Sequence, residues 1–78
     1  GKIVFNNETL KAIALTLKRE FDIDVEIDKD VDLNRSYTLT IEQSDNITEI
    51  IEIFRCLDNS LSYKIEKNTV YISNNKTE

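Results

Sequence analysis

The spacing of the apolar residues changes twice from the period of a helix to the period of a strand, and this alternation restricts the fold more than any other feature. A stripe at spacings of three and four runs from Leu10 to Phe21, which is typical of an amphipathic helix. Directly afterwards, Ile23, Val25 and Ile27 alternate with carboxylates, as in a strand with one buried and one solvated face. This stretch therefore predicts a helix followed by a half-buried strand.

The second half of the chain repeats this order. An alternating run at residues 37–41 predicts a strand, and a second helix follows Ser44, its expected N-cap. Alternating runs at residues 61–65 and 69–73 predict a hairpin with a tight turn at Lys67-Asn68, since Asn tolerates positive φ. The stripe of the second helix consists of Ile47, Ile50, Ile51, Phe54 and Leu57, widened by Ile53.

A short strand at residues 3–5 opens the chain, and Asn7 is the expected N-cap of the first helix. The sequence thus predicts one α+β domain over residues 2–73, in the order β-α-β-β-α-β-β, and a polar tail over residues 74–78. The two helical stripes superpose at an offset of 37 residues and the strands that follow them at 38. This weak internal repeat indicates two β-α-β motifs.

Both helices carry apolar side chains outside the main stripe, at Leu15 and Ile53. Leu15 has three interpretations: an isolated exposed apolar residue, a helix covered on two sides by two small sheets, or part of a patch that binds a partner. The sequence leaves all three open.

The composition argues against several classes of function. The chain has no His, so it lacks the usual general base near neutral pH and the commonest transition-metal ligand. Its single Cys cannot form an internal disulfide, and its net charge of −5 repels nucleic acid and anionic lipid. No apolar run approaches the roughly 20 residues that span a bilayer. Because the chain begins at Gly1 and has no Met, we expect a piece of a longer protein.

The acidic stretch over residues 20–32 offers no chemical site. Residues 28–32 begin like a D-x-D-x-D calcium loop, but Leu33 and Leu39 stand where such a loop needs Gly and Glu. By alternation, the carboxylates of residues 22–28 lie on the solvent side of a strand, where nothing desolvates them, so we expect no pair that works as acid and base. We therefore expect no catalysis, no metal and no cofactor.

The two segments IVFNNETLKAIALTLKREFDIDVEID and SYTLTIEQSDNITEIIEIFRCLDNSLSYKIEKNTVYI resemble the C-terminal domain of FecR-type anti-sigma regulators. The most distinctive stretches are Phe21-Asp22-Ile23 and Leu61-Ser62-Tyr63, whereas Phe54 stands where the family usually has a smaller aliphatic residue. The other matched positions include Phe5, Leu10, Leu17, Val25, Ile27, Thr38, Ile47, Ile50, Ile51, Leu57, Ile65 and Ile72.

The resemblance implies a fold and a role. The related fold is that of the short N-terminal domain of secretins and TonB-dependent receptors, in which two helices lie between a two-stranded and a three-stranded sheet. FecR-type proteins cross the inner membrane once and hold a sigma factor on the cytoplasmic side. Their periplasmic part receives a signal from the N-terminal domain of an outer-membrane receptor. The membrane segment is then expected upstream of residue 1.

We therefore predict a periplasmic protein-interaction domain of an anti-sigma regulator, with no enzymatic activity. A partner could add a strand to an exposed sheet edge, or the acidic face could steer a basic surface. The candidate contact residues are Leu15, Asp24, Glu26 and Asp28. The first alternative is the signalling N-terminal domain of a TonB-dependent receptor or a secretin. The second is a small module that binds a ligand or Ca²⁺.

Overall fold

A computed structural model describes residues 1–76, and two α-helices and five β-strands are formed in this part of the chain. Their order is the predicted β-α-β-β-α-β-β, which confirms the α+β class. The last two residues of the predicted tail lie outside the described residues. The elements are β1 (Lys2–Thr9), α1 (Leu10–Phe21), β2 (Asp24–Ile27), β3 (Ser36–Glu42), α2 (Ile47–Leu57), β4 (Leu61–Glu66) and β5 (Thr69–Asn74).

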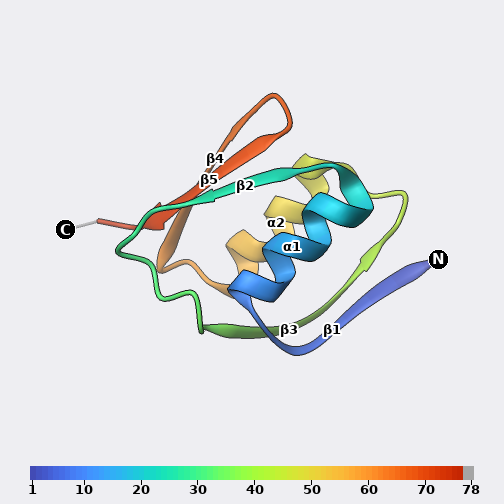
Figure 1. The fold of residues 1–78 in the computed structure, drawn as a ribbon, viewed down its shortest axis with the longest axis horizontal. Helices are drawn as coiled ribbons and strands as arrows, with labels where there is room; N and C mark the ends of the chain where they lie inside the picture. The colour runs from blue at the N-terminus through green and yellow to red at the C-terminus, as the bar shows by residue number, and fades with distance from the viewer. Residues whose placement is uncertain (77–78) are drawn as a thin grey trace.

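The strands form two small sheets with the two helices between them (Figure 1). Strands β1 and β3 pair antiparallel, with Phe5 opposite Leu39. The second sheet has the order β2-β5-β4, in which β2 is parallel to β5 and β4 is antiparallel to it. Each half of the chain thus contributes a strand to each sheet, and β5 joins the halves by lying between β2 and β4.

The core lies between the two sheets and contains the apolar faces of both helices. Leu57 was predicted in the stripe of α2 but is 48% exposed, because the helix ends there and the backbone becomes extended at Asp58. Conversely, Val31 is buried although it lies in a segment predicted to be a polar loop. The buried side chains are Phe5, Leu10, Ile13, Leu17, Ile23, Val31, Leu39, Ile41, Ile50, Ile51, Phe54, Leu61, Tyr63, Val70 and Ile72.

The two apolar residues outside the helical stripes differ in their surroundings. Ile53 is half-buried and packs against the core, as expected for a helix with sheets on two sides. Leu15 is 62% exposed, so the two sheets do not cover it. The interpretation of Leu15 as a helix position covered on two sides is therefore wrong.

The sequence predicted Asn7 as the N-cap of α1, but the N-cap is Thr9. The Thr9 hydroxyl accepts a hydrogen bond from Ala12 N at 3.1 Å. The preceding amides of the first turn, those of Leu10 and Lys11, donate to backbone carbonyls of residues 35 and 33. Asn7 instead has φ 54° in an irregularity of β1 between Phe5 and Glu8, and its amide donates to the Thr38 hydroxyl. The strand continues past the Asn-Asn pair, so the helix begins later.

The N-cap of α2 is likewise displaced, from Ser44 to Asn46. The Asn46 side chain accepts from Glu49 N and the Glu49 carboxylate accepts from Asn46 N, both at 2.9 Å, which forms a capping box. A Ser44 cap would lack this reciprocal bond. In the β4–β5 hairpin, the positive φ that was attributed to Asn68 falls on Lys67, at 55°.

Candidate functional site

The predicted contact carboxylates lie on and beside strand β2, all exposed to solvent. Asp24 is held by Lys18 at the end of α1, with 3.0 Å between Nζ and Oδ1. Glu26 and Asp28 form no ion pair with any of residues 1–76. Leu15 lies on α1, one turn before Lys18, and not on the strand. The structure therefore groups the three carboxylates and leaves Leu15 apart from them.

The backbone of β2 has one paired edge and one unpaired edge. The amides of Asp24 and Asp28 donate to carbonyls on the β5 side, those of Asn68 and Ile72, both at 2.9 Å. Because backbone groups of successive strand residues point to opposite edges, the N–H and C=O groups of Val25 and Ile27 point away from β5. No strand among the described residues pairs with that edge.

The outer face of the sheet adds an aromatic ring to the carboxylates of β2. Tyr71 on β5 is the register partner of Glu26 and is 42% exposed. An open groove of about 310 Å³ lies over this point, lined by Glu26, Ile27, Asp28, Tyr71, Ile72 and Ser73. A carboxylate beside an exposed aromatic face suits a cationic side chain, which both groups attract.

The opposite edge of the same sheet is occupied by a side chain. In β4, the carbonyl of Tyr63 points away from β5 by the same alternation, and Arg55 Nη2 donates to it at 2.9 Å. A side chain that bonds an outward carbonyl prevents another strand from using it. The two edges of this sheet thus differ: the centre of the β4 edge is capped and the β2 edge is open.

A polar network that the sequence did not reveal joins β3 to the connection between α2 and β4. Asp58 Oδ2 accepts from Arg35 Nη2 at 2.6 Å and from the Tyr37 hydroxyl, and Arg35 also donates to the Ser60 hydroxyl. Arg35 and Tyr37 are more than 20 positions before Asp58 and Ser60 in the sequence, so no local motif indicates the contact. The network links the start of β3, in one sheet, to the connection that leads into β4, in the other sheet.

The hydrogen bonds and charges of this network shift the pKa values of Tyr37 and Asp58. Burial and the hydrogen bond to Asp58 raise the pKa of Tyr37 to about 12. Burial alone would raise the pKa of Asp58, but hydrogen bonds from Ser60 and Tyr37 and the charge of Arg35 lower it below the usual value. At neutral pH the acid is ionised, the phenol is protonated, and both are bonded. Both groups hold β3 against the connection between α2 and β4.

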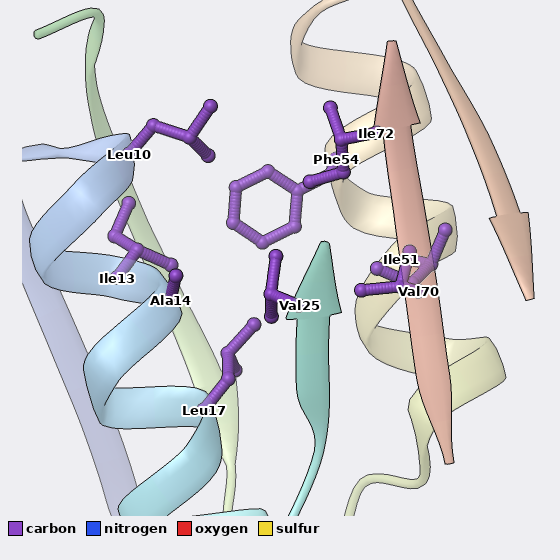
Figure 2. Close-up of a pocket in the computed structure, with 9 residues that line it drawn as sticks. All are labelled: Leu10, Ile13, Ala14, Leu17, Val25, Ile51, Phe54, Val70 and Ile72. Atoms are coloured by element: carbon purple, nitrogen blue, oxygen red, sulfur yellow. The ribbon is translucent and has the colours of Figure 1, made fainter. Parts of the chain in front are cut away.

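The interior cavity is too small to bind a ligand. Side chains of α1, β2, α2 and β5 converge on it (Figure 2), and its volume is about 10 Å³. All nine lining residues are apolar, which favours an empty void over a bound water. They are Leu10, Ile13, Ala14, Leu17, Val25, Ile51, Phe54, Val70 and Ile72.

The acidic loop after β2 does not gather its carboxylates around one point. Val31 turns into the core, its amide donates to the Asp28 carbonyl at 3.0 Å, and Asp32 Oδ1 accepts from Asn34 N. Within residues 1–76 no group of three or more His, Cys, Asp or Glu side chains could hold a metal ion. In the same residues, neither helix has the length and apolar character required to cross a bilayer.

The family model described as FecR, C-terminal, matches residues 2–72. Two crystal structures of proteins from Parabacteroides distasonis ATCC 8503, assigned as anti-sigma factors and determined at 1.65 and 2.50 Å resolution, have a similar fold. Each has a TM-score of 0.80 and 12% sequence identity over 97% of this chain. The chain spans about a third of their length, 35%. No curated protein matches the sequence. Because the family model covers nearly the whole chain, this protein belongs to the FecR C-terminal family.

Proposed function

We propose that this chain is the periplasmic protein-interaction domain of a membrane-spanning anti-sigma regulator. In this function, the domain receives a signal from the N-terminal domain of a TonB-dependent outer-membrane receptor. A sigma factor is the partner of the rest of the regulator, on the other side of the inner membrane. The domain has no chemistry of its own and acts by binding.

The open edge of β2, with Glu26 and Asp28 beside it, is the observation that carries this proposal. An unpaired strand edge can pair with a strand of another protein, and this edge offers backbone donors and acceptors together with uncompensated charge that attracts a basic partner. Membership in the FecR C-terminal family and the fold shared with the two P. distasonis proteins support the regulatory context.

The mechanism is a shift between two states of the regulator. A partner changes an equilibrium only by the difference between its affinities for the two states. The receptor domain must therefore bind β2 more tightly in the signalling state of the regulator than in the resting state. This difference releases or activates the sigma factor.

The proposal is tested by charge reversal in the full-length regulator in its own host. Glu26→Lys with Asp28→Lys should abolish ligand-induced transcription of the sigma-dependent genes at unchanged regulator level, because like charges then oppose the partner. Glu8→Lys is the matched control for Glu26→Lys alone, since Glu8 is also an exposed strand residue without an ion pair among the described residues, and it lies on the other sheet. Normal induction in the β2 variant, or after deletion of the whole domain, would remove the proposal.

The compartment is tested with the exposed thiol of Cys56. A membrane-impermeant maleimide, added to cells whose outer membrane has been permeabilised, should label the peptide that contains Cys56. A cytoplasmic protein is the control and should remain unlabelled until the inner membrane is broken. Labelling of Cys56 only after inner-membrane lysis would place the domain in the cytoplasm and contradict the proposal.

A further inference from the structure

The edges of the four outer strands differ in their ability to accept another strand. The edge of β4 is capped at Tyr63 by Arg55, and on the outer side of β3 the amide of Glu42 donates to Asp45 Oδ2 at 2.9 Å. Strand β1 is interrupted by the irregularity between Phe5 and Glu8, and such bulges protect an edge. Among the described strands, β2 has neither device.

The two faces of β2 determine which side chains an added strand should have on each of its own faces. Side chains of adjacent strands share a face with their cross-strand neighbours. On the outer face the neighbours are Asp24, Glu26 and then Asp28, which favour Lys or Arg. On the inner face the neighbours are Val25 and Ile27, both half-buried, which favour apolar side chains. A fitting segment therefore alternates basic and apolar residues.

The residue of such a segment that lies beside Glu26 can also contact a side chain of β5. Strands lie about 4.8 Å apart, so a long side chain beside Glu26 extends across β2 toward β5. There it meets the exposed ring of Tyr71, the register partner of Glu26, over the open groove. This position is best filled by Arg, whose guanidinium bonds a carboxylate and stacks on an aromatic ring.

We infer that the open edge of β2 binds an extended segment of the partner protein as an additional strand, with basic and apolar residues alternating and an Arg over Glu26 and Tyr71. The inference rests on the proposed function only in taking the partner to be a protein. It adds the binding mode, the residue pattern and the anchoring position.

The carboxylates of Asp24, Glu26 and Asp28 should contribute unequally to the binding of the added strand. Asp24 is compensated by Lys18 at 3.0 Å, whereas Glu26 and Asp28 have no cationic partner among the described residues. Glu26→Gln and Asp28→Asn should each weaken binding about two- to fivefold, as expected for the loss of an exposed ion pair. Asp24→Asn should weaken binding less, and it is the matched control for the loss of one charge.

The test uses the ¹⁵N-labelled 78-residue chain and a synthetic peptide of alternating Lys and Val with a central Arg. Saturating peptide should slow hydrogen exchange at the amides of Val25 and Ile27 about tenfold or more, because these amides become donors to the added strand. A peptide with the same composition but with its basic residues in one block is the control for charge alone, and it should leave exchange at these two amides unchanged.

Alternate N-methylation of the peptide tests the strand and gives its orientation. Methylation at the Val positions removes the donors that face β2 in an antiparallel strand, and methylation at the basic positions removes those of a parallel strand. One of the two methylated peptides should therefore lose binding and the other should keep it. Equal binding of both peptides, protection at other residues, or no binding at millimolar peptide would overturn the inference.

The two proposals fail in different ways. If a receptor domain binds the chain and signals, but protection lies away from β2, the added strand is excluded and the function stands. If the peptide protects Val25 and Ile27 but charge reversal leaves induction unchanged, the edge binds strands and the proposed signalling role is excluded.

Discussion

Asp22 ends helix α1 in a backbone conformation that suits glycine. Its φ of 55° and ψ of 36° are left-handed, and its N–H donates toward the carbonyls of Leu17 and Lys18. A residue with a Cβ loses about 1 kcal/mol in this region relative to glycine, part of which is offset by the greater freedom of glycine in the unfolded chain. Asp22→Gly also removes the ion pair with Lys18, but both side chains are exposed and Lys18 keeps Asp24. We expect Asp22→Gly to stabilise the fold by about 0.5–1 kcal/mol.

Urea unfolding followed by circular dichroism at neutral pH measures this change, and for a domain of this size it corresponds to a rise in Tm of about 2–8 °C. Asp22→Ala is the control, because it loses the same ion pair and keeps a Cβ. It should be less stable than the glycine variant by about 1 kcal/mol. If the alanine variant were as stable as the glycine variant, the left-handed backbone would not be the source of the effect and the reasoning would be refuted.

Three further predictions concern the core, a helix cap and the polar network. Phe54→Ala should lower the free energy of unfolding by about 3–5 kcal/mol, because this ring is 2% exposed and packs against Tyr37 and Tyr63. Calorimetry measures this change. Asn46→Ala should lower the free energy of unfolding, measured in urea, by about 1 kcal/mol, because it removes the N-cap of α2. Ser44→Ala, at the N-cap position that the sequence predicted, should leave this free energy almost unchanged. The pKa of Tyr37 is raised from 10.0 to about 12, so the unfolded chain loses this proton first and stability should fall between these two pH values. Urea midpoints at pH about 9 and about 11 should show a smaller fall for Tyr37→Phe than for the wild type.

The sequence was sufficient for the parts of the fold that depend on apolar periodicity. Both helices and the inward faces of the strands follow from side chains that must be removed from water. The outward direction of Asp24, Glu26 and Asp28 follows from the same alternation. These features are determined by neighbours within a few residues, which is why a single sequence contains them. The arrangement of the strands in two sheets pairs distant segments, and it was expected only from the resemblance to the FecR C-terminal domain.

The predictions from the sequence were wrong where contacts between distant segments determine the structure. Asn7 and Thr9 are both acceptable N-caps, and α1 begins after Thr9 because the first helical amides bond the loop at Leu33 and Arg35. Val31 is a single apolar residue in a polar segment, so it has no periodicity to mark it as buried.

The features of the candidate site that distinguish one edge from another are also long-range. The bond from Arg55 to the Tyr63 carbonyl depends on how α2 packs beside β4, and Arg35 reaches Asp58 across 23 residues. Charge patterning identifies the acidic strand, but it does not show which strand edge remains open. That information requires the order of strands in the sheet.

The central place of β5 has a consequence for biosynthesis. Strands β2 and β4 obtain their neighbour only when residues 69–74 are available, and these follow all other strands of the domain in the sequence. A nascent chain that stops before them has two solitary strands and an incomplete apolar interior, so it should remain sensitive to proteases. Synthesis of β5 and acquisition of the native fold of this domain are thereby coupled, and products truncated before β5 should be degraded and not accumulate as half-folded competitors.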